Sequence, residues 1–95
     1  MTDEKAYEEK LDAKINEWKA KLDEVKAKAD GASADARIEY AKNIDDIKGR
    51  LSALENKAKD LKKSGAQNLE TVEEEAKRLF GEIEKSYSRL TEKLK

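Results

Sequence analysis

Large apolar residues recur along the chain at steps of three and four residues, in three separate stretches. This spacing puts them on one side of an α-helix, with polar residues elsewhere, and is typical of helices that pack against partner helices. The predicted seam consists of Leu11, Ile15, Trp18, Leu22, Val25 and Ala29; of Tyr40, Ile44, Ile47, Leu51, Leu54, Ala58 and Leu61; and of Leu69, Val72, Ala76, Leu79, Ile83, Tyr87, Leu90 and Leu94. We therefore predict an all-α protein whose helical segments shield one another from water.

A strong helix stop follows the second stripe, at K-K-S-G over residues 62–65. Cations suit the negative C-terminal end of a helix dipole, and glycine accepts the left-handed conformation that ends many helices. Two pairs then have capping-box spacing, which starts helices: Ser64 with Gln67, and Thr71 with Glu74. The sequence predicts a hinge at Gly65, one helix that ends near residue 63, and a shorter C-terminal helix over about residues 67–94.

The stretch around Gly31 permits two interpretations. If Gly31 ends a helix, Ser33 can cap the next one, and the chain is a compact three-helix bundle with a turn at Gly31. If the helix continues, Ala29 and Tyr40 lie eleven residues apart, three turns of about 3.67 residues, and both stripes share one face. The neighbouring alanines favour helix and offset much of the roughly 1 kcal/mol that glycine costs there.

The sequence favours the second interpretation, a continuous helix over about residues 3–63. Such a helix is roughly 90 Å long, and its midpoint falls at Ser33, where small side chains allow two helices to cross closely. Two chains then form an antiparallel helical coiled coil with a three-helix cross-section, because each C-terminal helix folds back on the long ones. This homodimer and the compact bundle share their seams and are related by domain swapping, with Gly31 as the hinge.

Charged residues make up 45% of the chain and hydrophobic residues 37%, a composition typical of long helices. The net charge of −1, with both signs interspersed, argues against nucleic-acid binding, which needs a surplus of cations on one face. Most charges are expected to form a solvated helix surface. Six acid–base pairs have the i,i+4 spacing that supports exposed helices: Glu17–Lys21, Glu24–Lys28, Asp46–Arg50, Glu55–Lys59, Glu73–Lys77 and Glu74–Arg78.

The chain has few residues suited to catalysis. It has no His for proton transfer at neutral pH, no His or Cys to bind a zinc or redox metal, and no glycine-rich phosphate loop, because its four glycines are isolated. We predict a non-catalytic protein with no cofactor, no metal and no small-molecule substrate. The chain has no cysteine for a disulfide, no apolar span of 18 residues, and a polar, acidic start unlike a signal peptide. We therefore predict a cytoplasmic protein.

Three stretches carry a family resemblance: K-A-Y-E-E-K-L-D-A-K-I-N-E-W over residues 5–18, K-L-D-E-V-K-A-K-A-D over 21–30, and A-D-A-R-I-E-Y over 34–40. With the Ile44–Leu51 seam and the amphipathic segment Leu69–Leu94, nearly the whole chain resembles small bacterial coiled-coil domain proteins of unassigned role. That family tends to show Lys or Ala in place of Gly31, and Trp in the last helix. The resemblance implies a coiled coil without a catalytic motif, and a link to stress responses.

We predict a structural or protein-interaction module that self-associates or binds another helical protein. Trp18 lies in the seam and is expected to be a core anchor rather than a partner-binding hot spot. An alternative is an amphipathic protein of lipid or granule surfaces, like an apolipoprotein or a phasin, because adjacent Leu79 and Phe80 widen the apolar face of the last helix. A third hypothesis is a desiccation protectant that is disordered until dried.

Overall fold

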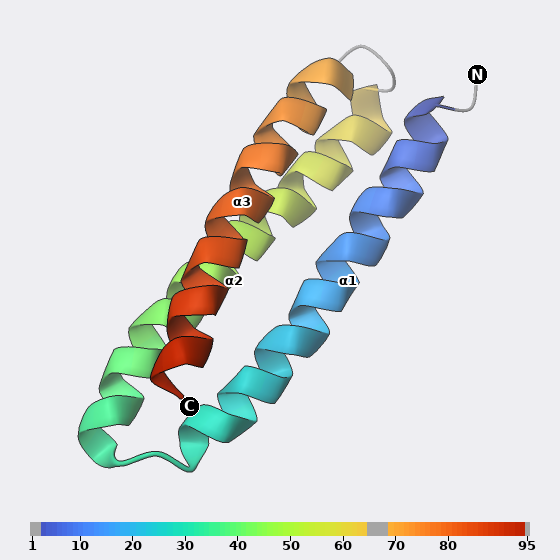
Figure 1. Ribbon diagram of the computed structural model, residues 1–95. Coiled ribbons are helices and arrows are strands. Elements are labelled where there is room, and N and C mark those ends of the chain that lie inside the picture. The colour runs from blue at the N-terminus through green and yellow to red at the C-terminus, as the bar shows by residue number, and fades with distance from the viewer. Residues whose placement is uncertain (1–2, 65–68, 95) are drawn as a thin grey trace.

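The structure is a computed structural model, and it describes residues 3–64 and 69–94. In these ranges the chain forms three helices: α1 (Asp3–Asp30), α2 (Ala34–Ser64) and α3 (Leu69–Lys93). As Figure 1 shows, α2 folds back along α1 and α3 folds back along α2, so that α1 and α3 run parallel. The bundle measures 51 × 18 × 17 Å. The predicted all-α fold with a three-helix cross-section is confirmed.

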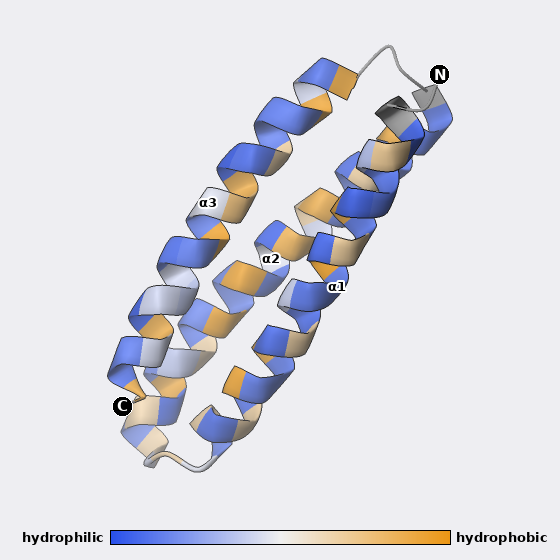
Figure 2. Ribbon diagram, turned by 45° about the vertical axis from the view of Figure 1, so that its right-hand side comes forward, coloured by the Kyte–Doolittle hydropathy of each residue, from blue (hydrophilic) through white to orange (hydrophobic). Residues whose placement is uncertain are grey.

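One apolar core runs the length of the bundle, and α2 packs against both other helices. Figure 2 shows the apolar residues as bands along the helices, with hydrophilic residues over the remaining surface. The side chains with no exposed surface come from the second and third stripes: Ile47, Leu54, Leu61, Ile83 and Leu90. The spacing of apolar residues therefore selects which side of each helix faces inward.

Residues 31–33 form a turn between α1 and α2. The amides of Gly31 and Ala32 donate to the carbonyls of Lys28 (3.2 Å) and Ala29 (3.0 Å), which satisfies part of the C-terminal end of α1. Ser33 begins the next helix, because its hydroxyl oxygen accepts a hydrogen bond from the amide of Ala36 at 3.4 Å. The turn at Gly31 and the cap at Ser33 match the compact-bundle interpretation.

The favoured continuous helix over residues 3–63 is wrong for this chain, since α1 ends at Asp30 and α2 begins at Ala34. A straight helix in a single chain leaves the stripe Leu11–Ala29 facing water, whereas the turn buries it against the same chain's α2 and α3. The eleven-residue phase fits the bundle too, because Ala29 and Tyr40 are both buried on either side of the turn. The homodimer stays a prediction.

The structure describes the two helix ends that the connection between α2 and α3 joins, but not residues 65–68. α2 ends at Ser64, close to the predicted stop, and α3 begins at Leu69 and ends at Lys93. The hinge at Gly65, and the residues that pair with Ser64 in the proposed capping box, lie outside the described residues. Thr71 lies inside α3, so its pairing with Glu74 does not start that helix.

Candidate functional site

The predicted seam residues come together in one core. Nearly all are buried, Trp18 with 6% of its surface exposed, and Leu69, Tyr87 and Leu94 are partly buried and pack against the others. Trp18 is a core anchor, as predicted, and its ring meets that of Tyr87 edge-on, with centroids 5.2 Å apart. A role of this seam in self-association remains a prediction. The polar and aromatic contacts of the molecule lie at the boundaries between helices.

Ion pairs cross the boundary between α1 and α2. Lys19 Nζ lies 3.0 Å from Glu55 Oε2, and Lys62 Nζ lies 3.1 Å from Asp12 Oδ2. All four side chains are well exposed, so each pair contributes little to stability, about 0.2–1 kcal/mol. These pairs matter more for specificity than for stability, because ion pairs beside an apolar seam favour one pairing of helices over others.

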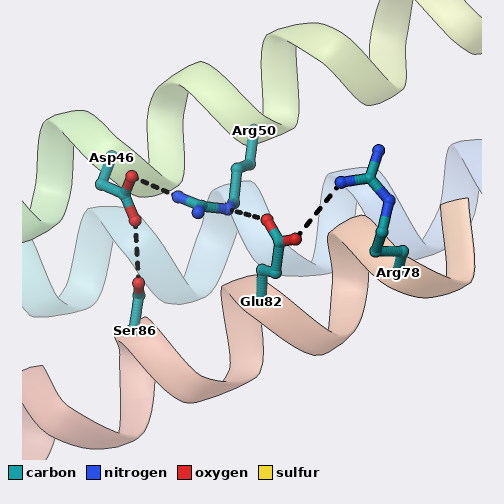
Figure 3. A network of polar contacts seen from close by, with 5 residues as sticks. All are labelled: Asp46, Arg50, Arg78, Glu82 and Ser86. Carbon is teal, nitrogen blue, oxygen red and sulfur yellow. Dashed lines mark hydrogen bonds and ion pairs between the residues drawn. The ribbon is translucent and has the colours of Figure 1, made fainter. Parts of the chain in front are cut away.

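A polar network crosses the boundary between α2 and α3 (Figure 3). Arg50 Nε donates to Glu82 Oε2 at 2.7 Å, and the same guanidinium pairs with Asp46 one turn away on α2. Asp46 also accepts a hydrogen bond from the hydroxyl of Ser86 at 2.9 Å. Arg78 Nη1 lies 3.4 Å from the second carboxylate oxygen of Glu82, Oε1. The i,i+4 pair Asp46–Arg50 was one of the six that the spacing predicts.

This network shifts the pKa values of three of its members. Hydrogen bonds from Arg50 lower the pKa of both Asp46 and Glu82, and the bonds to Asp46 and then Glu82 raise the pKa of Arg50. Lys57 and Glu75 form a further ion pair across this boundary. Ion pairs therefore join α2 to α3 beside the apolar core.

Two contacts join the start of α2 to the end of α3. The hydroxyl of Tyr40 donates to the backbone carbonyl of Lys93 at 2.9 Å, and Lys93 Nζ lies 3.1 Å from Glu39 Oε1. The carbonyl groups of the last helical turn lack partners within their own helix, so the Tyr40 hydroxyl satisfies one of them at the C-terminal end of α3. The sequence placed Tyr40 in the seam but gave no sign of this hydrogen bond.

The boundary between α1 and α3 has a different chemistry. Lys14 Nζ lies 5.0 Å from the centroid of the Phe80 ring, and Trp18 packs on Tyr87. Lys21, on the same helix as Trp18, has its Nζ 4.6 Å from the centroid of the Trp18 ring. Among the side chains that the structure describes, no ion pair joins α1 to α3. Aromatic and cation–π contacts connect these two helices instead.

A cleft of about 430 Å³ opens at this boundary, near the first turns of α1 and α3. Its apolar lining comes from Tyr7, Leu11 and Phe80. The charged lining is Lys10 and Lys14 from α1, and Glu70, Glu73, Glu74 and Lys77 from α3. Burial raises the pKa of the Tyr7 phenol, and the nearby Glu73 carboxylate raises it further, so Tyr7 stays neutral at physiological pH.

The three apolar stripes of the sequence do not predict this cleft. A signal was present, because Tyr7 and Lys14 are seven residues apart, as are Glu73 and Phe80. Positions seven apart share one flank of a helix, so these residues mark the two flanks that meet beside the seam. The cleft offers lysines, carboxylates and a phenol. In the part of the chain that the structure describes, no group of three or more acidic side chains is placed to hold a metal ion.

Comparisons with known proteins give no relative for this chain: no protein family, no curated protein and no solved structure matches it. The resemblance to small bacterial coiled-coil proteins therefore remains a prediction, as do the link to stress and the cytoplasmic location. None of the helices in the described ranges combines the length and apolar content needed to cross a bilayer. The structure defines the fold class, a three-helix bundle.

Proposed function

We propose that this protein is a non-catalytic helical module that acts by packing against helices of another chain, in the first instance a second copy of itself. The boundary between α1 and α3 carries the proposal. It is joined by aromatic and cation–π contacts, and it opens into a cleft with an apolar lining between two charged walls. An apolar groove with a polar rim between two helices is a common site for a further helix.

The charges of the cleft support this proposal. Beside the other two boundaries, lysine, arginine and carboxylate side chains pair between helices, as Lys19 does with Glu55. By contrast, Lys10, Glu70 and Glu74 form no ion pair with any side chain that the structure describes. Charges that a chain leaves unpaired beside a groove are available to select and orient a partner.

The residue content supports a non-catalytic role. The chain has no His, the usual agent of proton transfer at neutral pH, and no Cys for nucleophilic or redox chemistry. Charged residues make up 45% of the chain, and those at helix flanks can set which helices pair and in which orientation. A structural or interaction role uses these residues directly.

The mass of the protein in solution tests self-association. One chain has a mass of 10.8 kDa. We expect light scattering at low salt to show a rise from one chain towards two as the concentration increases from about 10 µM to about 1 mM. The mass of a single chain throughout this range contradicts self-association.

We also propose that the protein acts in the cytoplasm in a response to stress. This proposal is supported by the resemblance of the sequence to small bacterial coiled-coil proteins. We expect a source strain that lacks the protein to survive heat or osmotic stress less well than the same strain with the protein restored. Equal survival of the two strains contradicts the stress-related role.

A further inference from the structure

We propose that the outward face of α2 binds the same face of a second copy, with the two α2 helices antiparallel. The two-fold axis that relates the copies lies in the plane of contact, perpendicular to α2, at the level of residues 43 and 44. The inference rests on the proposed self-association and assigns it to a defined surface and register. The cleft between α1 and α3 then stays open to a helix of another protein.

The outward face of α2 carries a second stripe with heptad spacing. Its members recur at steps of three and four residues, and all of them are exposed: Asp35, Ile38, Lys42, Asp45, Gly49 and Ser52. At about 100° per residue, this stripe lies on the opposite side of α2 from the buried stripe that starts at Tyr40. Because α1 and α3 both pack on the buried side, neither helix obstructs the outward face.

Ile38 and Gly49 form the apolar part of the contact. Ile38 is 63% exposed, and it is the one large apolar side chain that the described part of the chain leaves exposed. Gly49 has open space above it, since an added Cβ atom meets nothing within 4 Å. In an antiparallel pair of this stripe, Ile38 of each copy packs over Gly49 of the other. Each copy thus supplies both a side chain and the space that receives it.

The same register pairs the charges of this face. Ile38 and Gly49 lie at equal distances on either side of the midpoint between residues 43 and 44, and so do Lys42 and Asp45. The register that sets Ile38 against Gly49 therefore places Lys42 of each copy beside Asp45 of the other, on both sides of the axis. A parallel pair would instead bring Lys42 against Lys42 and Asp45 against Asp45. The charges thus favour the antiparallel arrangement.

These charges are available for such a contact. Lys42 and Asp45 are exposed, and neither forms an ion pair with any side chain that the structure describes. At the ends of the contact, Asp35 of each copy lies beside Ser52 of the other, where the hydroxyl can donate to the carboxylate. The contact spans about five turns of one helix from each copy. We therefore expect a weak dimer that dissociates as salt screens its charges.

Charge reversals at two positions test the contact. Lys42→Asp places four carboxylates around the axis of the dimer, and Asp45→Lys places four ammonium groups there. For each variant alone, we expect sedimentation equilibrium at low salt to give a dimer dissociation constant about tenfold higher or more. An equimolar mixture of the two variants is expected to associate as a heterodimer, because every charge on the face of one chain then lies beside an opposite charge of the other.

Two charge controls separate this contact from the effect of net charge. The double variant, Lys42→Asp with Asp45→Lys, keeps the net charge of the natural chain and is expected to dimerise like it, because the exchange restores both pairs. Lys26→Asp changes the net charge as much as Lys42→Asp does, at an exposed position of α1. Its dissociation constant is expected to equal that of the natural chain.

Ile38→Gln tests the apolar part of the contact without a change of charge. Since glutamine loses the apolar area that isoleucine buries over Gly49, we expect the dissociation constant to rise about tenfold. Circular dichroism at micromolar concentrations, where the weak dimer is dissociated, establishes that every variant is folded.

A dimer that is insensitive to Ile38→Gln and to both charge reversals overturns the α2 contact while the proposed self-association stands. Domain swapping at Gly31 gives this result, because its contacts are those of the core and not of the outward face of α2. Equal weakening by Lys26→Asp and Lys42→Asp also overturns the α2 contact, since net charge then governs association. A natural chain that remains a monomer up to about 1 mM overturns both proposals.

Discussion

Leu51 and Ile38 lie on the same helix but in opposite surroundings. Leu51 is 3% exposed and belongs to the predicted seam, whereas Ile38 is 63% exposed. Removal of a buried side chain loses its transfer free energy and leaves a cavity, so Leu51→Ala is expected to lower the free energy of unfolding by about 2–5 kcal/mol. Ile38→Ala is the matched control, with an expected change within about 0.5 kcal/mol.

Urea unfolding followed by circular dichroism measures both changes. Burial rather than residue type sets the difference between them, because both substitutions remove a large aliphatic side chain from α2. Equal losses for Leu51→Ala and Ile38→Ala contradict the assignment of the seam.

Gly49 lies in the middle of α2, where its flexibility has no structural use. A Cβ atom added there meets nothing within 4 Å. Gly49→Ala is therefore expected to raise the free energy of unfolding by up to about 1 kcal/mol, since alanine loses less backbone entropy in a helix. Thermal unfolding measures this gain, and a destabilised Gly49→Ala variant contradicts the open surroundings of this position.

Gly31 provides an informative comparison with Gly49. Its backbone is not in the left-handed region that favours glycine, and an added Cβ atom is only in ordinary contact, 3.5 Å from the Lys28 carbonyl oxygen. Gly31 also lies outside both helices, so alanine gains less there than at Gly49. The turn thus depends on the packing of the helices and on the Ser33 cap, not on a conformation that only glycine adopts.

At the scale of elements, the Arg50 network makes the attachment of α3 to α2 sensitive to acid. Arg50 lowers the pKa of Asp46 and Glu82 from ordinary values of 3.8 and 4.5. A carboxyl whose pKa is lower in the folded state stabilises the fold above its unfolded pKa, and this contribution is lost as pH falls through the folded pKa. We expect the network's contribution to be constant above about pH 5.5 and to decline below about pH 4.5.

Arg50→Met separates this effect from the titration of the other carboxylates, because methionine keeps an aliphatic stem without the charge. The natural chain should have the higher melting temperature at pH 7, and the difference should shrink as the pH falls below about 4. A difference that stays constant from neutral to acidic pH contradicts the assigned role of Arg50.

The helices and their inward faces could be predicted from the sequence, because the spacing of apolar residues directly encodes a buried stripe. The turn of the chain at Gly31 could not be predicted from the sequence. The phase between Ala29 and Tyr40 suits both a continuous helix and the turn, in which both residues remain buried. What decides between them is the apolar surface of α1, which the chain buries when it folds back on itself, without a second chain. A local spacing pattern carries no information about this burial.

The cleft was missed for a related reason. Periodicity identifies the residues at the centre of a seam, but Tyr7 and Lys14 lie on its flank, where polar and apolar residues mix. Whether a flank is closed by ion pairs or remains open depends on which helix lies opposite. That neighbour is set by the order in which the three helices pack, with α2 against both others.

At the scale of the whole molecule, the placement of α3 bears on the lipid-surface alternative. The wide apolar face of α3 supported that alternative, but Leu79, Phe80 and Ile83 are all buried in the bundle core. A lipid surface can reach this face only if α3 leaves α2, which breaks the Arg50–Glu82 contact and exposes the core side of α2. Helix packing and lipid binding therefore compete for the same residues.

Vesicles of anionic phospholipid give the corresponding prediction. The folded chain is expected to show the same helical circular dichroism in buffer and with vesicles, and to remain in solution when the vesicles float. Because the protein carries a net charge of −1 and the apolar side of α3 is covered, neither attraction needed for surface binding is available. A gain in helix together with co-flotation would show that lipid competes successfully for α3, and would favour a surface-binding role over helix packing.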